Sequence, residues 1–325
     1  MEIKIGYHAS HEQFSPSHLL SLAQMAQQAG FDTALSSDHI VPWSERQGNS
    51  GYSWAWLGAA MQKTGLDYGV VCAPGQRYHP AIIAQAAATL AEMFPGRFWL
   101  AAGSGQLINE SVTGERWPPK WMRNERLRES VDVIRRLWAG EEVTHYGHVN
   151  VEHARLYVKP KTPPLLVGAA ITPQTAEWVG GWADALITIS KPHDQLREVV
   201  DAFRRGGGEG KPMFLKVQLS YSNTDQNALQ GAYDQWRTVI FDSPVLTDLR
   251  FPWDLDAAGS FVTPEQVREH VRVSDSPHMF VDLLGKDVEL GFERLYLHNV
   301  NKEQEPFIEV FGETVVPQLR NIFRG

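Results

Sequence analysis

Cysteine, basic charge and long apolar runs are all scarce in this sequence, and each shortage excludes a class of protein. The single cysteine, Cys72, can form no intrachain disulfide and no thiolate zinc cage. Thirty basic against 38 acidic residues give a formal net charge of -8, which opposes binding to nucleic acid or to an anionic membrane. No stretch approaches the roughly eighteen apolar residues of a membrane span, and the N-terminus has no signal-peptide pattern. We therefore expect a soluble, cytoplasmic protein without a nucleic-acid or membrane partner.

Several catalytic signatures are missing as well. The sequence has no G-x-S-x-G elbow, and Cys72 lacks a recognisable local nucleophile signature, which disfavours covalent acyl chemistry. His8, His11 and His39 could begin a metal site, but no acidic strand ends supply the remaining ligands. We expect no metal ion.

What the chain does contain is a regular alternation of strand and helix patterns. Its 325 residues would suit two average domains or one α/β barrel. Eight short apolar runs each precede a segment with helical spacing. These runs cover residues 2–9, 32–38, 66–73, 97–105, 163–170, 184–190, 211–222 and 292–300. The alternation predicts a closed parallel (β/α)8 TIM barrel, and an open doubly wound sheet is the alternative.

Three segments depart from this alternation. Residues 42–53 form a loop that is longer than a plain connection requires, which is typical of a functional loop. Residues 143–160 have the extended pattern of a hairpin with a glycine at its turn. Residues 242–262 are irregular and precede a predicted helix over 264–273. We expect one domain over residues 1–325 with these three segments as insertions.

Polar side chains follow the second predicted strand, at the end of a barrel where active sites lie. His39 could transfer protons, because imidazole titrates near neutral pH, or it could be a hydrogen-bonded turn histidine. The adjacent Asp38 would point to the opposite side in an extended segment. It could contact a ligand or cap the next turn.

Small residues follow the fourth and fifth predicted strands, in "AAGSGQ" and "GAAIT". Such turns allow either a close approach of backbone to a ligand or tight packing of helix on strand. Thr172 and Pro173 suit an N-cap and a first helical position. A helix starting there would direct free backbone N–H groups at the barrel mouth, where they would bind phosphate.

These motifs together resemble those of the bacterial luciferase-like flavin oxidoreductase family. The resemblance spans almost the whole chain. It is carried by "IGYHASHEQFSP", "SSDHIVPW", "RYHPAIIAQAAATL", "PGRFWLAAGSGQLINE", "RLRESVDVIRRLW" and "WVGGWADALIT". It is strongest to the branch that contains deazaflavin-dependent glucose-6-phosphate dehydrogenase and FMN-using relatives. It implies a luciferase-like TIM barrel, commonly paired as a homodimer.

The expected activity that follows from the resemblance is that of an FMN-dependent oxidoreductase. Such an enzyme would act on a small organic substrate by hydride transfer or monooxygenation, with a flavin reductase as a further partner. The alternative is a deazaflavin-dependent dehydrogenase of a sugar-phosphate-like substrate.

The resemblance also implies roles for particular residues. His39 would handle protons, with Trp43 near the reacting centre and Glu12 in the same pocket. Asp38 would lie at the cofactor ring, and Asn109 would help to hold the cofactor. Further cofactor contacts are implied for Val71, Cys72, Gly105, Gly168, Ala169, Ala170 and Thr172.

The sequence departs from the dehydrogenase pattern at Gln106, at His270 and in residues 245–255, which offer no lysine. Gln106 stands where that branch has an acidic proton donor, and an amide cannot give up a proton at neutral pH. Lys191 aligns with one lysine of the sugar-phosphate grip, and His270 stands in place of its arginine. Both are expected to bind substrate, but the departures make glucose 6-phosphate a doubtful one.

Overall fold

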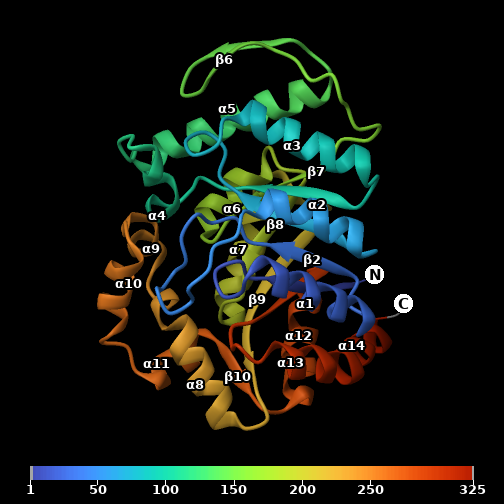
Figure 1. Ribbon diagram of the computed structural model, residues 1–325, viewed down its shortest axis with the longest axis vertical. Helices are drawn as coiled ribbons and strands as arrows, with labels where there is room; N and C mark the ends of the chain where they lie inside the picture. Colours follow the sequence, from blue (N-terminus) through green and yellow to red (C-terminus); the bar gives the residue numbers. More distant parts are fainter. Residues whose placement is uncertain (1–2, 324–325) are drawn as a thin grey trace.

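Eight parallel strands form the centre of the computed structural model, which describes residues 3–323 apart from the side chains of residues 243 and 244 (Figure 1). The strands are β1 (Lys4–Ala9), β2 (Thr33–Ser36), β3 (Asp67–Cys72), β4 (Phe98–Ala102), β7 (Leu165–Ala169), β8 (Ala185–Ile189), β9 (Met213–Tyr221) and β11 (Arg294–Asn299). Each lies within one of the eight runs predicted from the sequence. Neighbouring strands pair in the order β9-β11-β1-β2-β3-β4-β7-β8, and a further pairing of β8 with β9 closes the ring. The predicted TIM barrel is confirmed, and the open doubly wound sheet is wrong.

Large side chains that point inward fill the barrel near the amino-terminal ends of its strands. Trp99, Phe214 and Tyr296 pack together, with ring centroids 5.1 to 6.4 Å apart. Gly69 makes room for them, because a Cβ there would lie 2.0 Å from the Trp99 ring. This end of the barrel is therefore sealed, and any ligand site must lie toward the opposite, carboxyl end of the strands.

Helices surround the barrel and bury the outer faces of the strands. They are α1 (Pro16–Gln28), α2 (Ser53–Lys63), α3 (Pro80–Met93), α5 (Lys120–Trp138), α6 (Pro173–Gly180), α7 (His193–Phe203), α8 (Asp225–Trp236), α12 (Pro277–Glu289), α13 (Gln304–Val310) and α14 (Val316–Phe323). Several begin with proline, which fits the first helical turn because its missing N–H has no helical partner there. Their apolar faces and the strands form the main hydrophobic core.

The segments that depart from the strand–helix alternation have different outcomes. Residues 37–52 contain no helix or strand, and the predicted hairpin is present as β5 (Val143–Tyr146) and β6 (Asn150–Ala154). The irregular structure expected for residues 242–262 is wrong, because α9 (Ser243–Asp248) and α10 (Pro252–Gly259) form there, both with proline in the first turn. The predicted helix 264–273 ends early: α11 (Pro264–His270) is followed by β10 (Arg272–Ser274), which pairs with the end of β9. The single domain over residues 1–325 stays a prediction.

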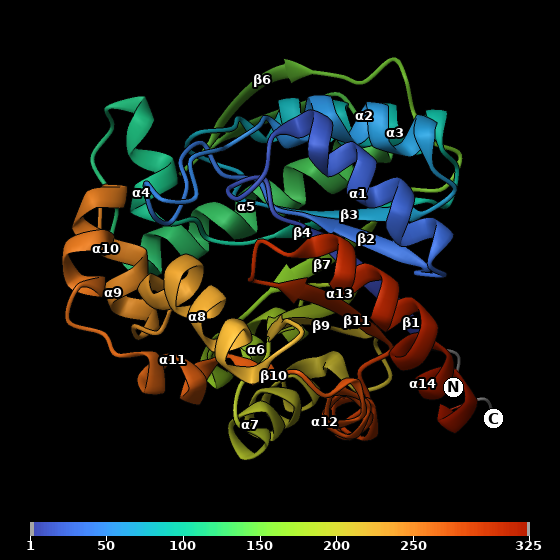
Figure 2. The same ribbon diagram turned by 60° about the horizontal axis from the view of Figure 1, so that its bottom comes forward.

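The rim of the barrel mouth is built from several of these added elements. In both views α4 (Leu107–Glu110), α9 and α10 lie together at the end of the molecule opposite the two termini (Figures 1 and 2). Trp43, Ile108, Trp236 and Leu255 belong to a second hydrophobic cluster on this rim, separate from the main core. The long loop after β2 is thereby anchored to α4, α8 and α10.

Candidate functional site

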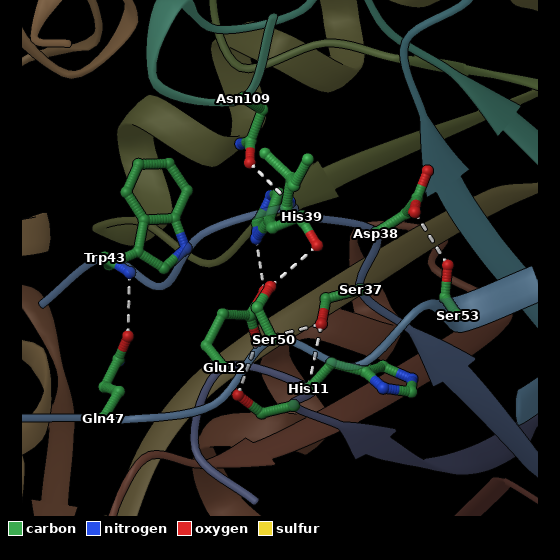
Figure 3. A network of polar contacts seen from close by, with 12 residues as sticks. His11, Glu12, Ser37, Asp38, His39, Trp43, Gln47, Ser50, Ser53 and Asn109 are labelled. Atoms are coloured by element: carbon green, nitrogen blue, oxygen red, sulfur yellow. Dashed lines mark hydrogen bonds and ion pairs between the residues drawn. The ribbon is translucent and has the colours of Figure 1, made fainter. Parts of the chain in front are cut away.

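An acid–imidazole pair lies at the barrel mouth (Figure 3). Glu12, in the turn after β1, is buried, and its Oε1 contacts Nδ1 of His39, which follows β2. Its Oε2 accepts hydrogen bonds from Ser10 Oγ (2.8 Å) and Ser37 Oγ (2.9 Å). Burial acts to raise the pKa of Glu12, but the charge and hydrogen bond of His39 outweigh it and lower that pKa below its ordinary value. Glu12 is therefore ionised and can only accept, so Nδ1 of His39 carries the shared proton.

The second ring nitrogen of His39 is open to a ligand. Nε2 has no hydrogen-bond partner among residues 3–323, and the side chain is 20% exposed. Trp43 packs edge-on against the ring at 5.1 Å, so the two predicted residues are together. The backbone is held on both sides: Ser50 Oγ donates to His39 O (2.7 Å), and Ile40 N donates to Asn109 Oδ1 (3.0 Å). When Nε2 is unprotonated, this fixed imidazole can accept a proton there.

Asp38 turns away from His39 (Figure 3). Its Oδ1 accepts hydrogen bonds from Ser53 Oγ (2.8 Å) and Tyr78 OH (3.0 Å). Nη2 of Arg77 donates to Asp38 Oδ2 (3.2 Å) and to its carbonyl oxygen (2.8 Å). The carboxylate therefore braces the loops after β2 and β3 and does not orient His39. Its expected contact with the cofactor stays a prediction.

The turn after β4 holds the other predicted residues of that strand. Gly105 has φ +81°, a left-handed conformation that favours glycine. The Gln106 side chain is half-buried and makes no hydrogen bond among the described residues. Glu110, at the end of α4, was missed from the sequence: it is buried, its Oε2 accepts from Arg77 N (2.8 Å), and burial raises its pKa. Glu110 thus supports Arg77.

The turn after β7 combines tight packing with open backbone donors. A Cβ at Gly168 would lie 2.2 Å from Val179 Cγ1, so this glycine is required for packing α6 against β7. The predicted N-cap is present, because Thr172 Oγ1 accepts a hydrogen bond from Thr175 N (3.3 Å). The backbone N–H groups of Thr172 and Gln174 donate to no described residue. This donor set fits a phosphate group.

The remaining predicted cofactor contacts lie at the ends of β3 and β7. Cys72 is buried, and burial raises the pKa of its thiol well above the ordinary value, so it is no nucleophile. Val71 and Ala169 pack against the inner barrel cluster and stay partly exposed. Ala170 is buried, and its N donates to Ile187 O (3.0 Å). Val71 and Ala169 therefore leave a partly exposed apolar surface on two strands that flank β4.

An unpaired lysine lies inside the barrel, and sequence reasoning missed it. Lys216, on β9, makes no ion pair or hydrogen bond through Nζ within residues 3–323, and Nζ lies 5.2 Å from the Trp236 ring centroid. Burial lowers the pKa of Lys216 to about 8, against the raising effect of Glu12. The His8 and His298 rings lie 4.4 Å apart, and Nδ1 of each is buried without a hydrogen-bond partner in the described part of the chain. Buried polar groups without partners indicate a place for a polar ligand.

Burial, with the charge of Lys216 as a further cause, also acts on the two histidines. It lowers the pKa of His8 and of His298 well below the ordinary value, so both rings are neutral at pH 7. The alternation of Phe214, Lys216 and Gln218 along β9 could have revealed the lysine, because every second residue of a barrel strand faces inward.

Among the described residues, the two predicted substrate residues and His11 make no hydrogen bond, ion pair or ring contact with the side chains of Lys216, His8 or His298. The charge of His11 has only a minor effect, after that of burial, on the pKa of His8. Lys191 follows β8 and is half-buried, and burial lowers its pKa while Asp242 opposes that shift. His270 is exposed at the end of α11. His11 turns to Ser36, with Nε2 2.9 Å from its Oγ. Within residues 3–323 no group of three or more His, Cys, Asp or Glu side chains could hold a metal ion.

Comparisons with known proteins show which family the chain belongs to. The luciferase-like monooxygenase family matches residues 2–278, so the chain belongs to that family. An F420-dependent glucose-6-phosphate dehydrogenase of Nakamurella multipartita is 34% identical over 98% of this chain and 97% of its own length. Its counterpart in Mycolicibacterium smegmatis is 32% identical over 99% of each. The structure of an F420-dependent secondary alcohol dehydrogenase with an F420-acetone adduct has a TM-score of 0.92 and 29% identity, over 98% of this chain and 99% of that one.

The family membership makes the protein an oxidoreductase enzyme. An FMN complex occurs among more distant structures, such as a Baeyer-Villiger monooxygenase from Pseudomonas putida at 17% identity and TM-score 0.72, a likeness that concerns the fold alone. The more similar relatives use F420, so the comparisons favour the deazaflavin alternative over the FMN expectation. None of the helices within residues 3–323 is long and apolar enough to span a bilayer.

Proposed function

We propose that the protein is a deazaflavin-dependent alcohol dehydrogenase that uses coenzyme F420. The observation that carries this proposal is the pairing of the buried Glu12 carboxylate with Nδ1 of His39, which leaves Nε2 free at the barrel mouth. A dehydrogenase needs such a base for the hydroxyl proton of its substrate. The names of the F420-dependent relatives support the same choice of cofactor.

The mouth has the groups that such a cofactor requires. Open N–H groups at Thr172 and Gln174 suit its phosphate, because the start of α6 also carries the positive end of the helix dipole. Val71 and Ala169 leave a partly exposed apolar surface for the flat ring. When bound, the deazaflavin supplies a two-electron hydride acceptor.

The protein's own residues then manage the proton. His39 would accept the proton of the substrate hydroxyl at Nε2 as the carbon that bears this hydroxyl gives up its hydride to the bound coenzyme. The substrate would become a carbonyl compound, and the proton would stay on His39 as an imidazolium. Glu12 would stabilise that imidazolium through Nδ1, because a buried carboxylate orients a catalytic histidine and favours its positively charged form. Trp43, edge-on to the ring at 5.1 Å, limits where the substrate can lie.

The position of Lys216 favours one class of alcohol as the substrate. The Lys216 ammonium has no hydrogen-bond or ion-pair partner within residues 3–323, and Nδ1 of His8 and of His298 are buried without a hydrogen-bond partner there. A substrate with a second oxygen near the carbinol, such as a hydroxy acid or a polyol, would satisfy these groups. His270, which stands in place of an arginine of the sugar-phosphate grip, is exposed at the end of α11, which weighs against glucose 6-phosphate.

Two cofactor titrations test the proposal. Purified protein is titrated with F420 and, separately, with FMN, and is then screened with F420 against secondary alcohols, hydroxy acids, polyols and glucose 6-phosphate. We expect F420 to bind at micromolar concentration or better, and an alcohol to bleach its visible absorbance. Binding of FMN but not of F420 would overturn the proposal. Reduction of F420 needs no flavin reductase, because the substrate supplies the electrons.

A further inference from the structure

A cationic cleft opens beside the barrel mouth on this otherwise acidic protein. Its volume is ≈ 700 Å³, and it lies between α9 and the segment that leads into α5. Arg116, Lys120 and Arg123 line it, with Asp248 as the single acidic side chain in the lining. Three positive charges in one cleft of a chain with net charge -8 make a local attractor for an anion.

Arg123 is built into the wall of this cleft without a full set of partners. It is 5% exposed, and neither Nε nor Nη1 makes a hydrogen bond within residues 3–323. Its guanidinium lies over the Trp117 ring, 4.3 Å from the centroid. Asp248 makes its hydrogen bond to a different residue, because its Oδ1 accepts from Trp117 Nε1 at 3.0 Å. The same oxygen lies 4.0 Å from Arg123 Nη1, which is too far for a hydrogen bond. A buried guanidinium short of acceptors indicates a carboxylate or phosphate ligand.

A series of contacts connects the cleft with β7, the strand that leads to the start of α6. Lys120 Nζ donates to Ser104 Oγ at 2.6 Å, and Ser104 follows Gly103 at the end of β4. A Cβ on Gly103 would lie 3.6 Å from the Ala169 Cβ on the adjacent strand β7. Three residues beyond Ala169 is Thr172, with its open N–H. A ligand whose phosphate binds at α6 would need a flexible anionic extension to reach the cleft.

We propose that this cleft binds the oligoglutamate tail of coenzyme F420. The inference rests on the proposed function. The tail follows the phosphate of the coenzyme and carries a carboxylate on each glutamate, so its chemistry matches a cleft with two guanidinium groups and one ammonium. Arginine can hold a carboxylate through two parallel hydrogen bonds, and Arg123 is fixed in place by Trp117.

Calorimetric titration with three forms of the cofactor tests the inference. The forms are the deazaflavin nucleoside-like core without phosphate, the phosphate form without glutamate, and F420 with several glutamates. In the wild-type protein we expect affinity to rise from the second form to the third, and this gain to shrink as salt is added. In Arg123→Gln the gain from the tail is expected to fall about tenfold, the loss of one charged hydrogen bond. Affinity for the glutamate-free form stays as in the wild type.

Matched variants keep the result interpretable. Lys120→Gln and Arg116→Gln change exposed residues of the cleft. If Arg123→Gln does not fold, these two variants are expected to show the same smaller gain in affinity from the tail. Arg136→Gln removes an exposed arginine of the same helix, which pairs with Glu141, and is expected to change nothing. Equal affinity for the forms with and without glutamates overturns the tail site. Failure of every form to bind instead overturns the proposed function.

Discussion

Glu12 and His39 come from the turns after two neighbouring strands, β1 and β2, and meet through a carboxylate oxygen and Nδ1. Neither residue has another ion-pair partner among residues 3–323. The pair therefore acts as a unit whose free end is Nε2 of His39.

Removing the imidazole is expected to stop catalysis and to spare cofactor binding. In His39→Ala we expect kcat to fall on the order of 10²- to 10⁴-fold, the usual worth of a positioned base, with F420 affinity unchanged. His18→Ala, which changes an exposed histidine on α1, is the control. Normal turnover in His39→Ala would take His39 out of the proposed chemistry.

Replacing the carboxylate separates support from proton transfer. Glu12→Gln keeps an acceptor for Nδ1 but removes the charge that stabilises an imidazolium. We expect lower kcat, and an acid limb of the kcat–pH profile that moves to lower pH, because the neutral base persists there. A lower kcat with an unmoved acid limb would assign Glu12 a purely structural part.

Lys216 predicts a pH-dependent substrate affinity. Its pKa is about 8, so the ammonium is present below pH 8 and is lost above it. We expect KM for an alcohol with a second oxygen to rise above pH 8 in the wild type. In Lys216→Met the KM is expected to be about tenfold higher at pH 7 and flat with pH, the loss of one charged hydrogen bond. Lys302→Met, on the exposed loop after β11, is the control, and an identical profile in Lys216→Met would contradict the assignment.

A negative charge at the start of α6 tests the phosphate position, because it is expected to stabilise the helix and to weaken cofactor binding. Gln174→Glu adds a negative charge to the first turn, which stabilises a helix by about 0.3–1 kcal/mol. The same charge beside the open N–H groups repels phosphate, so we expect F420 affinity to fall and affinity for the phosphate-free core to stay. Gln226→Glu makes the same change in the first turn of α8, where we expect no effect on binding. Unaltered F420 affinity in Gln174→Glu would move the phosphate elsewhere.

Acid is expected to destabilise the fold through buried neutral histidines. Burial lowers the pKa of His11 to about 4, against about 6.5 in an unfolded chain. Between these values the unfolded chain binds more protons, so the free energy of unfolding falls as pH drops below 6.5. For His11 alone the loss is about 2 kcal/mol at pH 5. Urea unfolding at pH 7.5 and pH 5 measures it; His11→Gln is expected to reduce the difference, and His153→Gln, an exposed control, to leave it.

The eight strands could be predicted because buried parallel strands read as apolar runs with turn residues at their ends. The His39 position followed from the same logic, since it stands just after β2. The partner of its Nδ1 could not be derived from spacing, because Glu12 lies 27 residues away and the contact depends on how two turns fold over the mouth. Helices α9 and α10 were missed because they are short and are held by packing on the rim rather than by their own periodicity.

Lys216 shows a different reason for failure. Alternation along β9 puts Lys216 on the same face as Phe214, but a lysine within an apolar strand is usually taken for an outward-facing residue. The closed ring shows that this face is the inner one. Gly168 shows the converse: it was expected at a ligand, and its lack of a side chain is explained by the Val179 methyl 2.2 Å from where a Cβ would lie.

The second hydrophobic cluster gives the rim a stability of its own. Trp43, Ile108, Trp236 and Leu255 come from four separate segments, yet they pack on one another apart from the core that holds the barrel together. Regions with separate cores open as separate cooperative units. The backbone amides of these rim segments are therefore expected to exchange with deuterium together, and earlier than the amides of the barrel strands. The rim would then unfold locally as one unit while the barrel stays folded.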